Sequence, residues 1–451
     1  MKTTEFHLAI PSDVRAYLAR GWLLLGLFSL LVAGLFALLL VLARTPYFQS
    51  IIPWADFFYT ALIVHVDLSV LVWFLAVGGV LWSLNSNARF VVIGKAALAL
   101  AALGAAAMAL AAFTGEANPV TNNYIPVLQQ RFFLIGLALF AVGIALLVLR
   151  TLASLPKPGP NTEGASALCL GLLLAAATVA IALISIVWSY RAVPATIHDR
   201  AYFELLFWGG GHLLQFAYTL LMLVAWLWLA SASGVTSGIS ARIAMALLLL
   251  GFAPVLVAPI GYLAHDVVSA GHILFFTAHM KYAGGLAAVP IALILLYQLF
   301  RAAPASGAQP PLRAALAASV LLFSVGGVIG FLIQGTNVTI PAHYHGSIVG
   351  VTLAFMGLTY HLLPKLGYRQ PDRRWAFIQP WVLGGGQLLH ITGLAWSGGY
   401  GVQRKVAGAA QGLESSERMI AMGLMGLGGL IAIIGGLIFL VVVYRAMRRR
   451  R

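Results

Sequence analysis

The sequence predicts an all-α integral membrane protein with twelve transmembrane helices, forming a single domain over residues 1–451. Of the 451 residues, 61% are hydrophobic and only 9% are charged, which lies outside the range of soluble domains. Apolar stretches of about 20 residues recur along the chain, each long enough to cross the hydrocarbon core as a helix. They lack the regular alternation of membrane strands, so a helical bundle is favoured over a barrel.

The predicted spans follow one another with short polar connections. They cover residues 19–43, 57–85, 93–113, 131–150, 166–190, 203–231, 240–264, 272–299, 312–335, 341–366, 376–400 and 418–445. The segment TLASLPKPGPNTEGAS, between the fourth and fifth spans, is rich in Pro, Gly and Ser, which is typical of a linker.

Basic residues gather in alternate connections, and the net charge is +15. They are Lys2, Arg15 and Arg20 before the first span, Arg89 and Lys95 after the second, Arg150 and Lys157 after the fourth, Arg242 after the sixth, Arg301 and Arg313 after the eighth, and Lys365, Arg369, Arg373 and Arg374 after the tenth. By the positive-inside rule, both termini are expected to be cytoplasmic, and this agrees with the even number of spans, which places both termini on the same side. This charge therefore indicates orientation in membrane lipid, not a nucleic-acid partner, and we expect a multi-pass protein of a prokaryotic inner (plasma) membrane.

Several histidines fall inside or at the ends of the predicted spans, where ionisable groups point to function. His65 lies in the second span, His212 in the sixth and His265 at the end of the seventh, while His343 and His345 open the tenth. Imidazole is a good ligand for iron and copper. Residues two apart on a helix point about 200° apart. His343 and His345 therefore cannot bind one metal, but they can bind two, one on each side of the helix.

A single cysteine, Cys169, excludes an internal disulfide, a CxxCH haem attachment and a two-cysteine copper centre in this chain. Other intramembrane histidines, His279, His361 and His390, are best interpreted as hydrogen-bond partners between helices. The glycines of FWGGGH (207–212) allow helices to approach closely, leave room for a flat cofactor, or both.

Three motifs carry a family resemblance: AHYHGSIVGVTLAFMGLTYHLLP (342–364), FWGGGH, and GGYGVQRKV (398–406). The chain resembles the main subunit of the haem–copper oxidase superfamily, which includes cytochrome c oxidase subunit I and the nitric oxide reductases. The resemblance implies a bundle that binds two haems. His65 and His345 would ligate a low-spin haem, and His343 a high-spin haem. His212 and His265 would bind a non-haem metal, copper or iron. Arg404 and Lys405 would hold haem propionates, since both suit carboxylates; otherwise they are ordinary loop charges.

The chain departs from the family pattern at two positions. The seventh helix usually carries adjacent histidines, and here one is missing; Asp266 is the natural substitute, with His272 a second candidate if the loop folds back. Asp266 alternatively caps a helix or faces water. The active-site tyrosine often found four residues after the sixth-helix histidine is replaced by Phe216, and Tyr262 is the plausible replacement.

The resemblance implies a terminal respiratory gas reductase. Reducing O2 takes four electrons and uses the tyrosine, whereas joining two NO molecules into N2O takes two electrons and no tyrosine radical. The altered site therefore favours nitric oxide reduction. The alternatives are a cytochrome c or quinol oxidase that reduces O2 to water, a catalytically altered or assembly-related homologue, and a twelve-span transporter without haem. No electron-entry centre is encoded, so cytochrome c, a quinol or a companion subunit must supply electrons.

Overall fold

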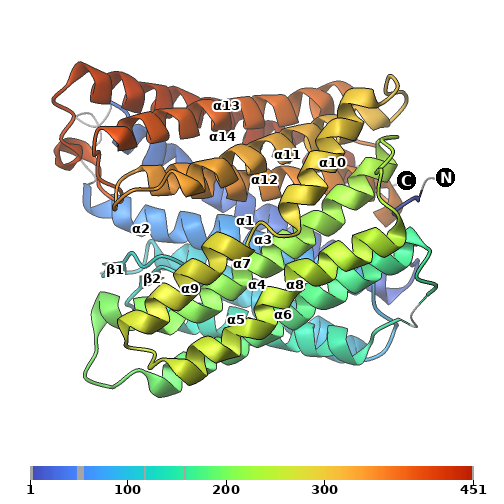
Figure 1. Ribbon diagram of the computed structural model, residues 1–451, viewed down its shortest axis with the longest axis horizontal. Coiled ribbons are helices and arrows are strands. Elements are labelled where there is room, and N and C mark those ends of the chain that lie inside the picture. The colour runs from blue at the N-terminus through green and yellow to red at the C-terminus, as the bar shows by residue number, and fades with distance from the viewer. Residues whose placement is uncertain (1–3, 48–54, 116–117, 157–158, 449–451) are drawn as a thin grey trace. The chain divides into compact units, whose positions relative to one another are not determined.

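The structure is a computed structural model that describes residues 4–47, 55–115, 118–156 and 159–448, and most of these residues are helical (Figure 1). The helices are α1 (Val14–Arg44), α2 (Ala55–Val66), the π-helix η2 (Asp67–Val72), α3 (Trp73–Leu84), α4 (Val91–Ala111), α5 (Arg131–Ala153), α6 (Gly164–Ala192), α7 (Asp199–Ala232), α8 (Ala241–Ala264), α9 (Ala270–Ala283), α10 (Ala288–Arg301), α11 (Gln309–Phe331), α12 (Thr339–Leu362), the 3-10 turn η3 (Pro364–Leu366), α13 (Arg373–Gly399), the 3-10 turn η4 (Gly408–Gln411) and α14 (Ser416–Met447).

The predicted all-α membrane fold is confirmed. When α2, η2 and α3 are taken as one span and α9 and α10 as another, the helices fall on the twelve predicted segments. In the described parts of the chain, ten spans are long and apolar enough to cross a membrane by length and composition. The other two, α12 and α13, contain polar side chains such as His343, His345 and Gln387.

Two spans are interrupted in ways that were not predicted. The second changes from α-helix to the π-helix η2 directly after His65 and Val66. The eighth is split by a turn over residues 284–287, just ahead of Pro290. Proline lacks an amide hydrogen and collides with the preceding turn, so it favours such a break.

A small hairpin, also not predicted, occupies the connection between α4 and α5. Strands β1 (Pro119–Val120) and β2 (Val127–Leu128) pair antiparallel, with Val120 opposite Val127. In its turn, the Asn122 side chain accepts a hydrogen bond from Tyr124 N at 3.0 Å and donates to Ile125 O at 2.5 Å. This local turn fixes the backbone at Tyr124.

The chain forms two compact units. Unit 1 comprises residues 1–30, 66–228 and 237–294, and unit 2 comprises residues 31–65, 229–236 and 295–451. Four of the five boundaries fall inside α1, α2, α7 and α10, and the fifth lies in the connection between α7 and α8. The single-domain organisation stays a prediction.

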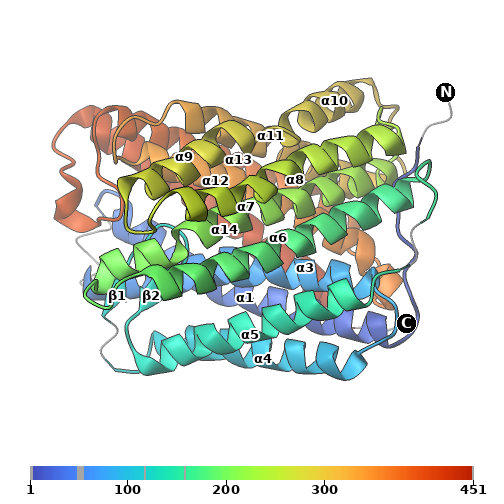
Figure 2. The same cartoon turned by 60° about the horizontal axis from the view of Figure 1, so that its bottom comes forward.

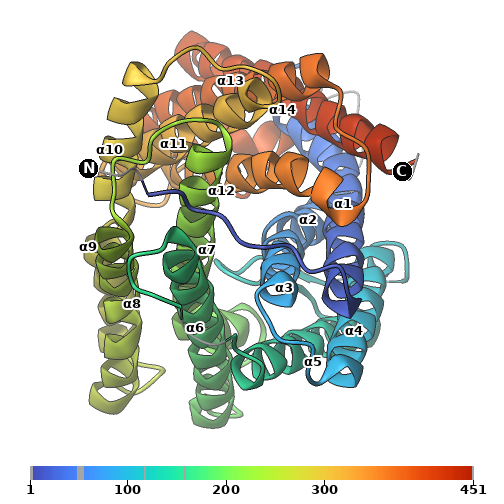
Figure 3. The ribbon, with the colours of Figure 1, turned by 90° about the vertical axis from the view of Figure 1, so that its right-hand side faces the viewer.

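Unit 1 is packed with aromatic side chains and closely spaced helices. Trp22, Trp73 and Trp82 are fully buried, and Trp82 Nε1 donates to Leu172 O of α6 at 2.9 Å. In this unit α4 and α5 lie side by side (Figure 2), as do α8 and α9 (Figure 3). At the start of α9, the Ser269 hydroxyl accepts from His272 N and caps the helix. This cap fixes the start of α9 directly after the connection from α8.

Unit 2 is built largely from α11–α14, with α13 and α14 in extensive contact (Figure 1). A side chain at Gly386 would place its Cβ 2.5 Å from Ala432 N, so glycine permits this close approach. Another turn is fixed at the start of α13, where Asp372 accepts from Trp375 N at 3.0 Å. The resulting close packing of α11, α12 and α13 positions the paired histidines at the beginning of α12.

Candidate functional site

His65 and His345, the predicted low-spin haem ligands, both belong to unit 2. The Nδ1 of His65 donates to Ala33 O of α1 at 2.9 Å, and the Nδ1 of His345 donates to Pro341 O at 2.8 Å. Neither Nε2 makes a hydrogen bond to a described residue. When a carbonyl holds the Nδ1 hydrogen, the neutral ring presents its Nε2 lone pair. Both side chains therefore fit axial ligation of an iron.

His343 faces a different neighbour from His345. The Nδ1 of His343 donates to Gly326 O of α11 at 2.7 Å. The His345 ring instead stacks on Tyr344 and lies edge-on to His390 of α13, with ring centroids 5.1 Å apart. The divergence agrees with the two histidines serving different sides of α12, since positions two apart point about 200° apart. The Nε2 of His343 also makes no described hydrogen bond, so it too is available to a metal.

Two arginines lie near Tyr344 in unit 2. Arg404 lies close enough for its charge to act on Tyr344, as does Arg44 at the end of α1. Gln403 pairs with Asn337 in an isolated bridge, which ties the segment carrying Arg404 and Lys405 to the start of α12. Lys405 adopts a left-handed backbone (φ 58°), a conformation that bulky residues rarely take.

Arg44 was missed by the sequence interpretation. Its guanidinium donates to Gln403 O and to the Gln411 side chain, both at 3.4 Å. The sequence could have indicated this residue, because Arg44 ends the first span on the predicted non-cytoplasmic side, where basic residues are otherwise sparse. Guanidinium groups bind carboxylates in a bidentate geometry, so Arg44 belongs with Arg404 as a candidate partner of haem propionates.

His212, the predicted first ligand of the distal metal, belongs to unit 1 and is bonded at both ring nitrogens. Its Nδ1 donates to Trp208 O at 2.7 Å, and its Nε2 accepts from the Tyr124 hydroxyl at 2.7 Å. Tyr124 stands in the hairpin turn, and sequence reasoning did not find it. In this arrangement His212 has no free lone pair, so it fits a metal only when the Tyr124 hydroxyl has moved aside.

Three side-chain hydrogen bonds join the hairpin segment to different turns of α7. Gln129 donates to Asp199 at 3.0 Å, Asn123 donates to Glu204, and Tyr124 donates to His212. The FWGGGH motif explains how the tyrosine fits there, because a Cβ at Gly211 would overlap the Tyr124 ring. The other two glycines face Tyr262 and the α6 residue Ile186. In unit 1, then, the motif permits close approach by other residues.

Further histidines surround Phe276 in the same unit. His212, His272 and His279 lie with ring centroids 5.8, 4.9 and 6.2 Å from the centroid of the Phe276 ring. His272 is fully buried, and its Nε2 has no hydrogen-bond partner among the residues described. His272 and His212 thus pack against the same ring, and the role of His272 as a metal ligand stays a prediction.

His265 and Asp266 lie at the end of α8 and in the following loop. His265 caps α8 and is half-buried, whereas Asp266 is exposed and its backbone carbonyl accepts from Ser269. Tyr262 lies nearby on α8, but its hydroxyl is shared with Ser185 O and the Ser189 hydroxyl, each at 3.1 Å. Across the described ranges, no three His, Cys, Asp or Glu side chains form a metal-binding group. The ligand set of the distal metal therefore stays a prediction.

Two of the histidines interpreted as structural do bridge helices. His390 Nδ1 donates to Met425 O of α14 at 2.9 Å, and His279 Nε2 donates to Pro254 O of α8 at 2.8 Å. Each bond joins adjacent helices, as proposed from the sequence. A bonded histidine of this kind needs no metal to explain its burial.

Comparisons with known proteins agree with this architecture. The family described as cytochrome C and quinol oxidase polypeptide I matches residues 17–438. An uncharacterised protein of Rickettsia prowazekii is 31% identical over 95% of this chain and 96% of its own length, and one of Aquifex aeolicus is 28% identical over 77% and 85%. A haem–copper terminal oxidase dimer solved by cryo-EM contains a chain with the same fold, at a TM-score of 0.74 and 15% identity, covering 98% of this chain and 85% of that one. The chain thus belongs to the cytochrome c and quinol oxidase polypeptide I family, the main subunit of the haem–copper oxidases.

Proposed function

We propose that this oxidoreductase is a terminal respiratory gas reductase that converts nitric oxide to nitrous oxide. The overall reaction joins two NO molecules with two electrons and two protons to give N2O and water. The protein would lie in a prokaryotic plasma membrane with cytoplasmic termini, as its loop charges favour. A cytochrome c, a quinol or a companion subunit would supply electrons.

His65 and His345 would hold the low-spin haem, and His343 the high-spin haem. The support is that all three rings have Nδ1 bonded to a main-chain carbonyl and Nε2 without a described partner. Arg44, Arg404 and Lys405 would bind propionates. Bound haem supplies one-electron redox chemistry; the residues of this chain fix its axial ligation and its charge surroundings.

Nitric oxide is favoured by the environment one turn after His212. Phe216 occupies this position, is buried, and packs 5.0 Å from the His279 ring. It cannot supply the electron and proton that a tyrosine gives to O2 cleavage. Tyr262, the alternative tyrosine, keeps its hydroxyl on Ser185 and Ser189. His265 and Asp266, with His212, remain the proposed distal ligands, with copper or iron as the metal.

A second candidate, reduction of O2 to water, is favoured by Tyr124. Its hydroxyl donates directly to the His212 ring, so a phenol does stand beside a proposed metal ligand, although it comes from the hairpin and not from α7. In that function Tyr124 would replace the tyrosine absent at position 216.

Gas turnover separates the two functions. The purified protein, supplied with an artificial reductant, would be assayed for N2O formation from NO under argon and for O2 uptake, alongside haem and metal analysis. We expect a Soret band and N2O production; O2 uptake without N2O would select the second function. Tyr124→Phe should then abolish O2 uptake, whereas NO reduction should survive that change; Tyr262→Phe tests in the same way whether Tyr262, the tyrosine expected from the sequence, has that role instead. A colourless protein that binds no haem would refute both functions and favour the transporter.

A further inference from the structure

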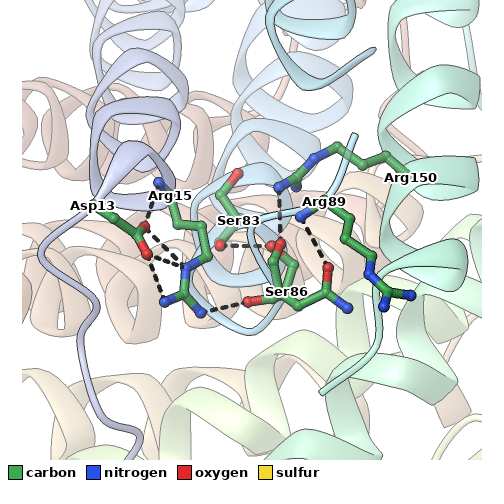
Figure 4. Close-up of polar contacts among 7 residues, drawn as sticks. Asp13, Arg15, Ser83, Ser86, Arg89 and Arg150 are labelled. Atoms are coloured by element: carbon green, nitrogen blue, oxygen red, sulfur yellow. Dashed lines mark hydrogen bonds and ion pairs between the residues drawn. The ribbon is translucent and has the colours of Figure 1, made fainter. Parts of the chain in front are cut away.

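Three arginines surround the turn after α3 at one end of unit 1. Arg15 comes from the start of α1, Arg89 from the connection before α4, and Arg150 from the last turn of α5 (Figure 4). Arg15 Nη1 donates to Ser86 O at 2.7 Å, and Arg150 Nη2 reaches Asn87 O at 3.5 Å. Two guanidinium groups are therefore directed at successive carbonyls of one turn.

Arg150 is buried, and no carboxylate among the described residues forms an ion pair with it. Its relative exposure is 1%, and its Nε and Nη1 have no hydrogen-bond acceptor in the portion of the chain that the structure describes. A Cβ at Gly94 would lie 3.0 Å from both Cδ and Nε of Arg150, so the glycine leaves room for this side chain. Burying an unpaired cation is costly, and such a group normally finds an anion.

The carboxylate of Asp13 is bound to Arg15. Asp13 accepts from Arg15 through both oxygens, at 2.9 Å from Nε to Oδ1 and 2.8 Å from Nη2 to Oδ2. These hydrogen bonds hold the pKa of Asp13 near 2, so the carboxylate remains charged and bound to Arg15. Neither Arg89 nor Arg150 makes an ion pair with a described residue. The turn thus carries two positive charges that the described chain does not balance.

Apolar side chains beside the arginines are exposed. Phe90, Val92 and Leu149 have relative exposures of 49%, 80% and 62%. Phe90 and Val92 follow Arg89 at the start of α4, and Leu149 precedes Arg150 at the end of α5; both helices are long and apolar enough to cross a membrane. An anionic lipid would offer both a phosphate for the guanidinium groups and acyl chains for the apolar side chains.

We propose that the turn of residues 85–89, together with Arg15 and Arg150, is a binding site for a phosphate group, carried by an anionic lipid headgroup or free in solution. The phosphate supplies the acceptors and negative charge that Arg89 and Arg150 lack. This site is separate from the histidines of the proposed gas chemistry and does not depend on their function.

The test uses the intact purified protein in detergent. Phosphatidylglycerol, phosphatidylcholine and inorganic phosphate are titrated separately, with thermal stability and native mass spectrometry as readouts. We expect phosphatidylglycerol to raise the melting temperature and to remain bound, and Arg150→Gln to weaken its binding at least tenfold. Arg242→Gln, which removes an exposed arginine of α8 in the same unit, should bind like the wild type.

The separate titrations distinguish a lipid headgroup from free phosphate as the source of the phosphate group. A shift produced by inorganic phosphate alone, and lost in Arg150→Gln, would support the site with a soluble ligand. If Arg150→Gln does not fold, Arg89→Gln carries the same test at an exposed position. The proposal would be overturned if neither phosphatidylglycerol nor inorganic phosphate binds. It would also be overturned if the wild type, Arg150→Gln and Arg89→Gln bind phosphatidylglycerol with equal affinity.

Discussion

His345 and His390 offer a matched pair for testing haem ligation, because their rings touch edge to face within unit 2, yet only one is a proposed ligand. His345 has Nδ1 held by Pro341 O within its own helix, which leaves Nε2 available. His390 uses Nδ1 to bridge to Met425 O of the neighbouring helix. We therefore expect replacement by alanine to remove a cofactor at one position and a structural hydrogen bond at the other.

The substitutions at the proposed ligands should change the haem content, whereas the substitution at His390 should change the stability. His345→Ala and His65→Ala should each lower haem content from about two to about one per protein, since a low-spin iron needs both axial ligands. His390→Ala should keep both haems and destabilise the protein by about 2 kcal/mol, because it leaves the buried Met425 carbonyl without that donor and removes a packed ring. His343→Ala should remove only the high-spin haem.

Haem extraction with pyridine gives the stoichiometry, reduced-minus-oxidised spectra separate low-spin from high-spin iron, and thermal unfolding gives the stability. Full low-spin signals in both His65→Ala and His345→Ala would refute the ligand assignment. Loss of that signal in His390→Ala, with His345→Ala unaffected, would transfer the ligand role to α13.

Three further outcomes are expected. Gly211→Ala should destabilise unit 1 by about 1–3 kcal/mol, since its methyl group would overlap Tyr124, and adding Tyr124→Ala should recover most of the loss in thermal unfolding. Hydrogen bonds from Arg15 lower the pKa of Asp13 from 3.8 to about 2. The Asp13 carboxylate therefore contributes fully to the free energy of unfolding above about pH 4, and this contribution disappears as the pH falls toward 2; because the side chain is exposed, it is at most about 0.5 kcal/mol. Asp13→Asn should make the melting temperature less dependent on pH between about pH 2 and pH 4. Arg44→Gln should lower the low-spin haem midpoint potential by roughly 50 mV, or about 1 kcal/mol, in a redox titration, because a positive charge near the haem favours its reduced form; an unchanged potential would place Arg44 away from the haem.

The number and order of the spans could be predicted because the bilayer imposes them. A helix must remain apolar for about 20 residues to cross, and this length is visible in any single sequence. The interruptions are less accessible. Pro290 marks the split between α9 and α10, whereas the change to π-helix at Asp67 has no comparable signal in VHVDLSVLV. Asp67 is fully buried, and its two carboxyl oxygens have no partner among the described residues.

Contacts between distant segments account for most of what the sequence did not reveal about the candidate site. Tyr124 and His212 are 88 positions apart, and Arg44 reaches residues more than 350 positions away. The family resemblance suggested His265 and Asp266 as metal ligands, but it gave no indication that His272 and His279 pack around Phe276. The different directions of His343 and His345 could be predicted from their spacing because both lie on the same helix, α12.

The tautomers of the candidate ligands could not be predicted for a more general reason. The groups that hold the Nδ1 hydrogens are main-chain carbonyls of Ala33, Gly326 and Pro341. A carbonyl oxygen has two lone pairs, so it can accept an imidazole hydrogen in addition to a helical bond. Since every residue carries a main-chain carbonyl, the type of the accepting residue gives no sign in the sequence that it holds a histidine. The histidines can therefore be identified in the sequence, but which nitrogen each presents to a metal depends on how closely the helices pack.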